Sequence, residues 1–307
     1  MSIRRITLAL SLCLFSAGCP DSEVAPPQAP GDAAPAAIET GAGSESPTPV
    51  NGAPKSADAE QKGATEPAAA PKLPPDDAES VAKLKEIGVA LDLRDGVVLK
   101  ADCQSAPIND ENVGLLKGLH SLKVLSLQNA TITDSGLAVL EAFPQLKLLN
   151  LRRCSQVTND GLAHLKSVPE LVQLELLYTT ISDDGLVHLA PLTELKALDL
   201  RGCNIRDKGL AHIAGLNKLE SLQIRAKYVT DKGLVNLTGM KSLRFLALED
   251  AYIKDAGLEH LAPLVDLEVL NLMRTYISDE GLKHLSGMTK LRDLRIRETK
   301  VRGPGLD

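Results

Sequence analysis

Apolar residues recur along the chain at a nearly constant interval of 24 residues, and this repeat constrains the fold more than any other feature. Seven of the eight steps are 24 residues long, and one is 25 residues long. A fixed period of this length predicts a solenoid in which each unit packs only on its neighbours. The recurring positions are Ile108, Ile132, Val157, Ile181, Ile205, Val229, Ile253, Ile277 and Val301.

Each repeat combines a strand pattern with a helical pattern. At the end of the segment 195–200, leucines alternate with polar residues, as one face of a short strand requires. Asp207 then precedes the segment 209–213, whose apolar spacing suits a helical turn. We expect the carboxylate to cap the start of that turn, because a side-chain oxygen there can accept free backbone N–H groups. The same role is predicted for Asp134, Asp231, Asp255 and Asp279.

Stacking such units has a geometric consequence. Parallel strands lie about 4.8 Å apart, whereas packed helices need roughly 8–10 Å, so the array bends with its strands on the concave side. The pattern L-x-L-x-x-T-x-I-T-D-x-G-L resembles the leucine-rich-repeat family, in particular its short bacterial type. Residues 149–162 also resemble the cysteine-containing repeat variant of F-box substrate receptors. The resemblance implies an α/β leucine-rich-repeat solenoid with convex helices, and a ligand-binding role.

The repeats, residues 108–307, follow a segment with a different pattern. Asp77 is placed to cap a helix with one apolar side. Two short apolar runs then flank Asp95-Gly96, a dipeptide typical of tight β-hairpin turns. We therefore expect residues 76–107 to form an N-terminal helix-and-hairpin cap. No comparable cap follows the last repeat, which predicts either an interface or a truncated chain.

The N-terminus has the organisation of an export signal. Two arginines precede the apolar run 6–15, and small residues then lead to Cys19. This arrangement resembles a bacterial lipoprotein signal, in which cleavage exposes the cysteine for lipid attachment, although Ser16 stands where that family more often has Leu. We predict a signal peptide over residues 1–18, lipidation of Cys19 and a location in the cell envelope, periplasmic or at the cell surface. An ordinary cleaved signal with an incidental cysteine is the alternative.

Residues 19–75 are rich in Ala, Pro, Gly, Ser and Glu and poor in residues that build a core. Ordering such a segment would not recover its conformational entropy, so the composition predicts a disordered tether. As a flexible coil the tether would reach roughly 40 Å, enough to hold a domain clear of a membrane.

Charge and composition disfavour several function classes. The net charge of −6 and the lack of tryptophan give no support for nucleic-acid binding. Five histidines share one repeat position, but helices in adjacent repeats are too far apart for a series of zinc sites. Lone aspartates do not make calcium loops, and the sequence has neither a phosphate-binding loop nor a nucleophile elbow. We therefore expect no metal, no cofactor and no enzymatic activity. The five histidines are His164, His188, His212, His260 and His284.

A small side chain with a hydrogen-bond donor recurs where the chain leaves each strand, and we expect it to satisfy backbone groups there. Cys154 and Cys203 are two repeats apart, about 10 Å, which is too far for a disulfide. The position holds Cys154, Thr179, Cys203, Thr275 and Thr299.

The concave face is expected to carry the function. Strand alternation sends two rows of side chains out of the arc, and arginines in adjacent repeats combine with apolar groups there. A protein or peptide segment with acidic and apolar groups would fit this surface. The predicted ligand-binding residues are Arg152, Glu175, Leu177, Asp199, Arg201, Arg225, Phe245 and Met273.

These observations predict an exported, lipid-anchored recognition module that binds a protein or peptide and touches the membrane only through its lipid. Two alternatives stay open. One is an envelope-structural or cell-surface assembly protein, which sedimentation at increasing concentration would reveal. The other is an F-box-like substrate receptor, which the export signal and the lack of a preceding F-box disfavour.

Overall fold

The computed structural model describes residues 74–225 and 227–303. The predicted signal peptide, Cys19 and all but the last two residues of the predicted tether lie outside this part of the chain. Within it, no helix is long and apolar enough to cross a membrane.

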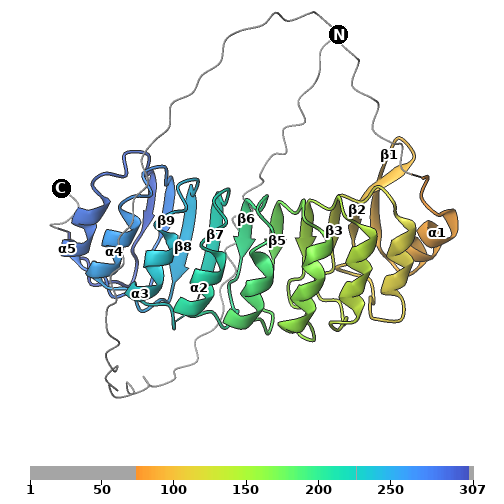
Figure 1. The fold of residues 1–307 in the computed structure, drawn as a ribbon, viewed down its shortest axis with the longest axis horizontal. Coiled ribbons are helices and arrows are strands. Elements are labelled where there is room, and N and C mark those ends of the chain that lie inside the picture. Colours follow the sequence, from red (N-terminus) through yellow and green to blue (C-terminus); the bar gives the residue numbers. More distant parts are fainter. Residues whose placement is uncertain (1–73, 226, 304–307) are drawn as a thin grey trace, which may run out of the picture. The chain divides into compact units, whose positions relative to one another are not determined.

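The strands of the described residues form one ten-stranded sheet in which they follow one another in chain order (Figure 1). The first two pair antiparallel as a hairpin, and every later pair of neighbours is parallel. Register follows the repeat, because the buried leucine of one strand lies beside that of the next, as for Leu149, Leu174 and Leu198. The strands are β1 (Ala90–Arg94), β2 (Val97–Asp102), β3 (Val124–Ser126), β4 (Leu148–Asn150), β5 (Gln173–Glu175), β6 (Ala197–Asp199), β7 (Ser221–Arg225), β8 (Phe245–Glu249), β9 (Val269–Asn271) and β10 (Asp293–Arg295).

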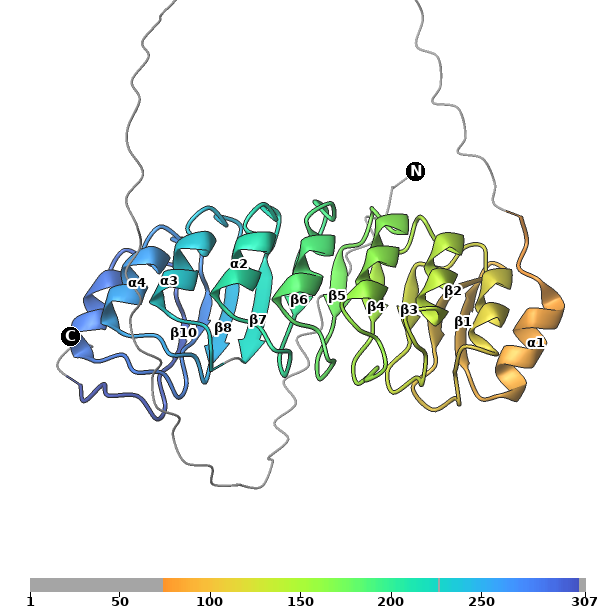
Figure 2. The ribbon, with the colours of Figure 1, turned by 60° about the horizontal axis from the view of Figure 1, so that its bottom comes forward.

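Short helices line the other side of the sheet in the repeat region (Figure 2). Helices this short are not stable alone, so packing of their apolar side on the sheet must hold them. The earlier repeats use 3₁₀ helices and the later ones short α-helices, two of which continue as a 3₁₀ turn. They are η1 (Val113–Gly118), η2 (Gly136–Ala142), η3 (Asp160–Ser167), η4 (Asp183–Leu189), α2 (Asp207–Ile213), α3 (Asp231–Leu234), η5 (Val235–Leu237), α4 (Asp255–Leu261), α5 (Asp279–Leu282) and η6 (Lys283–Leu285).

One continuous apolar core runs between the sheet and the short helices. The recurring apolar positions from Ile108 to Ile277 are all buried in it, and Val301 packs against it while partly exposed. The predicted α/β solenoid, with strands on one side and short helices on the other, is confirmed.

A helix and a hairpin precede the first repeat. Helix α1 (Ala78–Glu86) begins at Asp77, whose carboxylate accepts the Ser80 N–H at 2.9 Å. Asp95 and Gly96 form the turn between β1 and β2, with φ angles of 52° and 84° that suit a two-residue hairpin turn. The Asp76 carboxylate accepts backbone N–H groups from β2 and from the first repeat, and so joins the hairpin to the repeats.

The repeated aspartates bond to the following repeat, which corrects the expectation that each caps its own helix. Asp207 Oδ1 accepts the Thr230 N–H at 2.7 Å, and Oδ2 accepts the Thr230 hydroxyl at 2.6 Å. Thr230 is the residue before α3, so the carboxylate holds the start of the next helix. A Cβ on Gly233 would lie 2.4 Å from Asp207 Oδ1, and the same close approach to the preceding repeat explains the glycine at this position from Gly136 to Gly281. This aspartate ladder comprises Asp110, Asp134, Asn159, Asp183, Asp207, Asp231, Asp255 and Asp279.

The small donors at the strand exits bond to backbone carbonyls, as the sequence predicts. Thr179 Oγ1 donates to the carbonyl of Leu176 at 2.7 Å, and Cys203 Sγ donates to the same carbonyl at 3.1 Å. The described cysteines are free and buried, and burial raises the pKa of Cys154 to about 12. In the described ranges, no three or more His, Cys, Asp or Glu side chains come together as a possible metal site.

Candidate functional site

The outward side of the strands, here called the sheet face, carries two rows of side chains. The first row occupies the last residue of the short strands, such as Glu175 on β5 and Asp199 on β6, which pair directly in register. The second row lies two residues further along and contains Arg152 and Arg201. First-row oxygens accept second-row backbone N–H groups: the Arg152 N–H donates to Asn150 Oδ1, and the Arg201 N–H donates to Asp199 Oδ1. This local bond fixes the path of the chain at the edge of the sheet.

Arg152 and Glu175 stand out because neither forms an ion pair with another described residue. The Nε atom of Arg152 is buried and has no hydrogen-bond partner there. Glu175 accepts a hydrogen bond from Gln173 at 2.8 Å. Burial and the nearby Asp199 raise the pKa of its carboxyl group, and the attraction of Arg152 and Arg201 lowers it only in part. The sheet face therefore holds a cation and a partly buried acid that attract one another but share no ion pair or hydrogen bond among the described residues.

Asp199 and Arg201 are already paired with each other. Arg201 Nη2 lies 2.7 Å from Asp199 Oδ2, and Arg201 Nε also donates to this carboxylate. Asp199 is 8% exposed, and its hydrogen bond to Arg201 raises the pKa of the guanidinium. The pair is thus a fixed part of the surface, and Asp199 largely neutralises the positive charge of Arg201.

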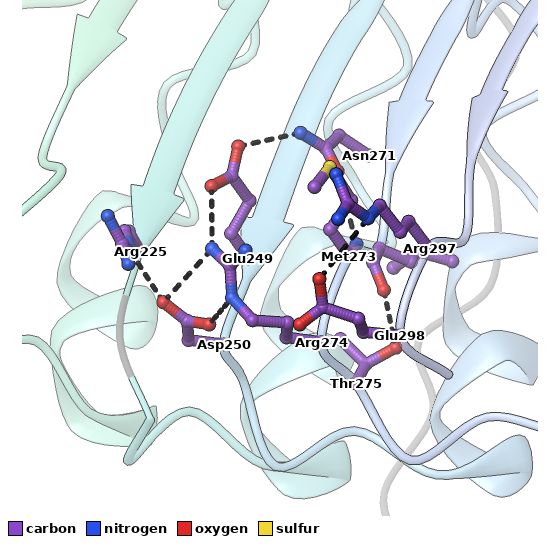
Figure 3. Close-up of polar contacts among 10 residues, drawn as sticks. Arg225, Glu249, Asp250, Asn271, Met273, Arg274, Thr275, Arg297 and Glu298 are labelled. Carbon is purple, nitrogen blue, oxygen red and sulfur yellow. Dashed lines mark hydrogen bonds and ion pairs between the residues drawn. The ribbon is translucent and has the colours of Figure 1, made fainter. Parts of the chain in front are cut away.

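Further along the sheet, a charge cluster joins three repeats (Figure 3). Arg225 and Arg274 both donate to the carboxylate of Asp250, and Arg274 also lies 3.5 Å from Glu249. Glu249 in turn accepts a hydrogen bond from Asn271 at 2.7 Å. Burial favours protonation of Asp250, but the two arginines outweigh it and lower the pKa of that carboxyl group. The cluster is preorganised, because each charged group has its partner before any ligand arrives.

Asp250 and Arg274 were not predicted from the sequence. Both occupy the position where the backbone turns off the strand with a positive φ, 61° and 56° respectively. The signal for them in the sequence is the 24-residue period itself, because it places a third row of side chains directly after the second row of the sheet face. That row includes Asn129, Arg153, Tyr178, Gly202, Asp250, Arg274 and Glu298.

The predicted apolar residues divide into two kinds. Leu177 is only 7% exposed although it lies outside the continuous apolar core, so it offers a ligand little surface. Phe245 at the start of β8 and Met273 beyond β9 are partly exposed on the sheet face. The residues predicted as one binding site thus fall into an unpaired group at Arg152 and Glu175, a fixed pair at Arg201, and the cluster around Asp250.

Comparison with known proteins agrees with this geometry. A family model described as a leucine-rich repeat region matches residues 121–304. The chain belongs to the leucine-rich repeat family. No curated protein matches the sequence at a significant level.

Solved structures share the leucine-rich repeat fold. Internalin C2 of Listeria monocytogenes has a TM-score of 0.53 and 24% identity, over 74% of this chain and 94% of the internalin. The ectodomain of the Arabidopsis receptor kinase HAESA, in complex with a peptide hormone, has a TM-score of 0.50 and 15% identity. That match covers 74% of this chain and 39% of the receptor chain. At these identities the likeness shows the fold alone.

Proposed function

We propose that this leucine-rich repeat protein is an exported, lipid-anchored recognition module whose sheet face binds a protein or peptide. The observation that carries the proposal is the lack of a direct ion pair at Arg152 and Glu175 among the described residues, with Arg152 Nε buried and without a hydrogen bond, on a face where the arginines further along are paired. A partly buried charge without a partner has a free-energy cost that a complementary ligand group removes. The peptide complex of HAESA supports a peptide-binding role for a domain of this fold.

Arg152 is the residue whose substitution tests the proposal most directly. Reversing Arg201 or Arg225 would leave Asp199 or Asp250 beside a new negative charge, which endangers the fold as well as binding. Arg152→Glu breaks no ion pair among the described residues. We expect it to weaken binding of the native partner at least tenfold, with a smaller loss of stability than Arg201→Glu because only the longer-range attraction to Glu175 is lost. Lys166→Glu on η3 is the matched control on the helical side.

The partner can be captured by photo-crosslinking in the native envelope. A benzophenone side chain at Phe245 faces outward from β8, whereas one at Val235 lies on the helical side. The proposal requires one protein that crosslinks from Phe245. Its crosslinking should fall when excess unlabelled chain is added and should be lost with Arg152→Glu. A partner that crosslinks only from Val235, or survives the charge reversal at full affinity, would refute the proposed site.

Anchoring and assembly have separate readouts. Mass spectrometry of the mature N-terminus should find a lipid on Cys19, and an unmodified start elsewhere would refute the anchor. Sedimentation at increasing concentration should show no growth in size. Open-ended assembly would favour the structural role instead.

A further inference from the structure

Three exposed tyrosines recur at one repeat position on the edge of the sheet where the strands end. Tyr228, Tyr252 and Tyr276 are 42%, 45% and 44% exposed, so a large part of each side chain is open to solvent. We call them the tyrosine row. Parallel bridges tie Tyr228 to Arg206 and Tyr252 to Thr230, so the backbone under the row is held in register. The rings of Tyr252 and Tyr276 touch, with centroids 4.7 Å apart.

Cations lie over each of these rings. The Arg206 guanidinium carbon lies 4.5 Å from the Tyr228 centroid, and Lys227 Nζ lies 4.9 Å from the same centroid. Lys254 Nζ is 5.1 Å from the Tyr252 ring, and Lys300 Nζ is 5.7 Å from the Tyr276 ring. Contact with an aromatic face holds a flexible basic side chain near one position.

These cations differ from those at the opposite edge, where the strands begin. There, lysines pair with acids one repeat away, as Lys147 does with Glu170, and Lys196 with Glu220. Within residues 74–225 and 227–303, none of Arg206, Lys227, Lys254 and Lys300 forms an ion pair. Among the described residues, these basic side chains are therefore in ion pairs at the edge where the strands begin, and without ion pairs over the tyrosines at the edge where the strands end.

The aspartates nearest to the tyrosine row accept hydrogen bonds from the following repeat. Asp231 accepts the backbone N–H of Lys254, and Asp255 accepts the N–H and hydroxyl of Ser278. These aspartate-ladder carboxylates take part in bonds between repeats, and although Lys300 attracts Asp255, neither Asp231 nor Asp255 forms an ion pair with the ammonium groups above the rings in the described part of the chain.

We propose that the tyrosine row binds an extended acidic segment of a protein partner, independently of the sheet face. Tyrosine and arginine are enriched at interface hot spots, and acidic side chains complement the open cations. At the strand spacing, three rings span about 10 Å, the length of about three extended residues. An anionic membrane fits less well, because the protein carries a net charge of −6 and the row has few cations.

Selection from a phage-displayed library of random dodecapeptides on the full-length protein tests the proposal. We expect enriched peptides to carry Asp or Glu beside apolar residues. A labelled copy of the most enriched peptide should bind in fluorescence anisotropy, and a copy with amides in place of its carboxylates should not. Replacing all three tyrosines by serine should weaken binding at least tenfold.

Matched variants show whether the tyrosine row itself holds the peptide. Replacing Val187, Val235 and Val265 by serine removes apolar groups of similar exposure elsewhere on the repeats and should leave peptide affinity unchanged. Arg152→Glu should also leave it unchanged, so failure here is distinct from failure of the sheet-face site. Enriched peptides without acidic residues, or retained affinity after loss of the three tyrosines, would overturn the proposal. Tyrosine-dependent binding to phosphatidylglycerol vesicles or to polygalacturonate, with no peptide binding, would overturn it too.

Discussion

Replacing Asp255 by alanine tests the aspartate ladder, the contact that the structure adds to the repeat pattern. Asp255 accepts the Ser278 N–H at 2.6 Å and the Ser278 hydroxyl at 2.7 Å. Ser278 precedes α5, so the carboxylate fixes the start of the next repeat's helix. Alanine removes both acceptors and leaves the N–H without its capping partner.

The size of the effect follows from these two bonds. A hydrogen bond to a charged group contributes about 1.5–3 kcal/mol, and loss of a capping side chain costs about 0.5–2 kcal/mol. Both residues are partly exposed, so water replaces some of each interaction. Taking the lower ends of the two ranges, about 1.5 kcal/mol for the charged hydrogen bond and about 0.5 kcal/mol for the cap, Asp255→Ala should lower the free energy of unfolding by about 2 kcal/mol.

The chain itself provides the conservative control. At the equivalent ladder position, Asn159 accepts the Ser182 N–H at 2.9 Å and donates to the Ser182 hydroxyl at 2.8 Å. Asp255→Asn facing Ser278 can form the same two bonds. We expect it to cost less than half of the alanine variant's loss.

Urea unfolding followed by far-ultraviolet circular dichroism measures both variants, with equal m-values required for the comparison. The pH dependence gives a second readout. Although burial opposes ionisation, the bonds from Ser278 lower the pKa of Asp255 below its ordinary value of 3.8. A lowered folded-state pKa means that the carboxylate's contribution is complete above the unfolded pKa and is lost as the pH falls through the folded pKa. The gap between wild type and Asp255→Asn should therefore close on acidification below about pH 4.

Two outcomes would refute this reasoning. One is an Asp255→Ala variant within about 0.5 kcal/mol of wild type, the range of ordinary surface substitutions. The other is an asparagine variant as unstable as the alanine variant, because the amide would then fail to replace the ladder bonds.

Three further predictions concern the same architecture. Gly257→Ala should lower the free energy of unfolding by about 2 kcal/mol in the same urea assay, because its Cβ would lie 2.3 Å from Asp231 Oδ1. Gly239→Ala, where a Cβ meets open space, should be near neutral, and equal effects of the two variants would contradict the close-approach argument. The buried thiols should resist iodoacetamide at pH 8, because burial raises the pKa values of Cys103 and Cys154 to about 12 and of Cys203 to about 11. Intact-mass spectrometry should count these thiols as modified only after unfolding, and rapid labelling of the native protein would refute this. Thermal melts with and without EDTA should coincide, and a large loss of stability with the chelator would reveal a metal site that the repeat pattern does not predict.

Much of the fold follows from local patterns in the sequence. The 24-residue period identifies the buried positions, and strand alternation identifies the residues of the sheet face. Asp95-Gly96 predicts the hairpin turn because both residues tolerate the positive φ that it requires. Thr179 predicts a backbone bond at its own strand exit, whereas the equivalent donor of Cys203 reaches the strand-exit carbonyl of the preceding repeat. In each case the partner is nearby in the chain or set directly by the strand period.

The tertiary structure alone decided which side chains meet across repeats. Asp207 could have capped its own helix, but the offset between stacked units brings its carboxylate to Thr230 in the next repeat. The same offset pairs Arg225 with Asp250, which belongs to a neighbouring row. Leu177 alternates outward in sequence, yet only 7% of it is exposed. The period specifies the rows but not the lateral shift and twist between repeats, and contacts of a few ångströms depend on that shift.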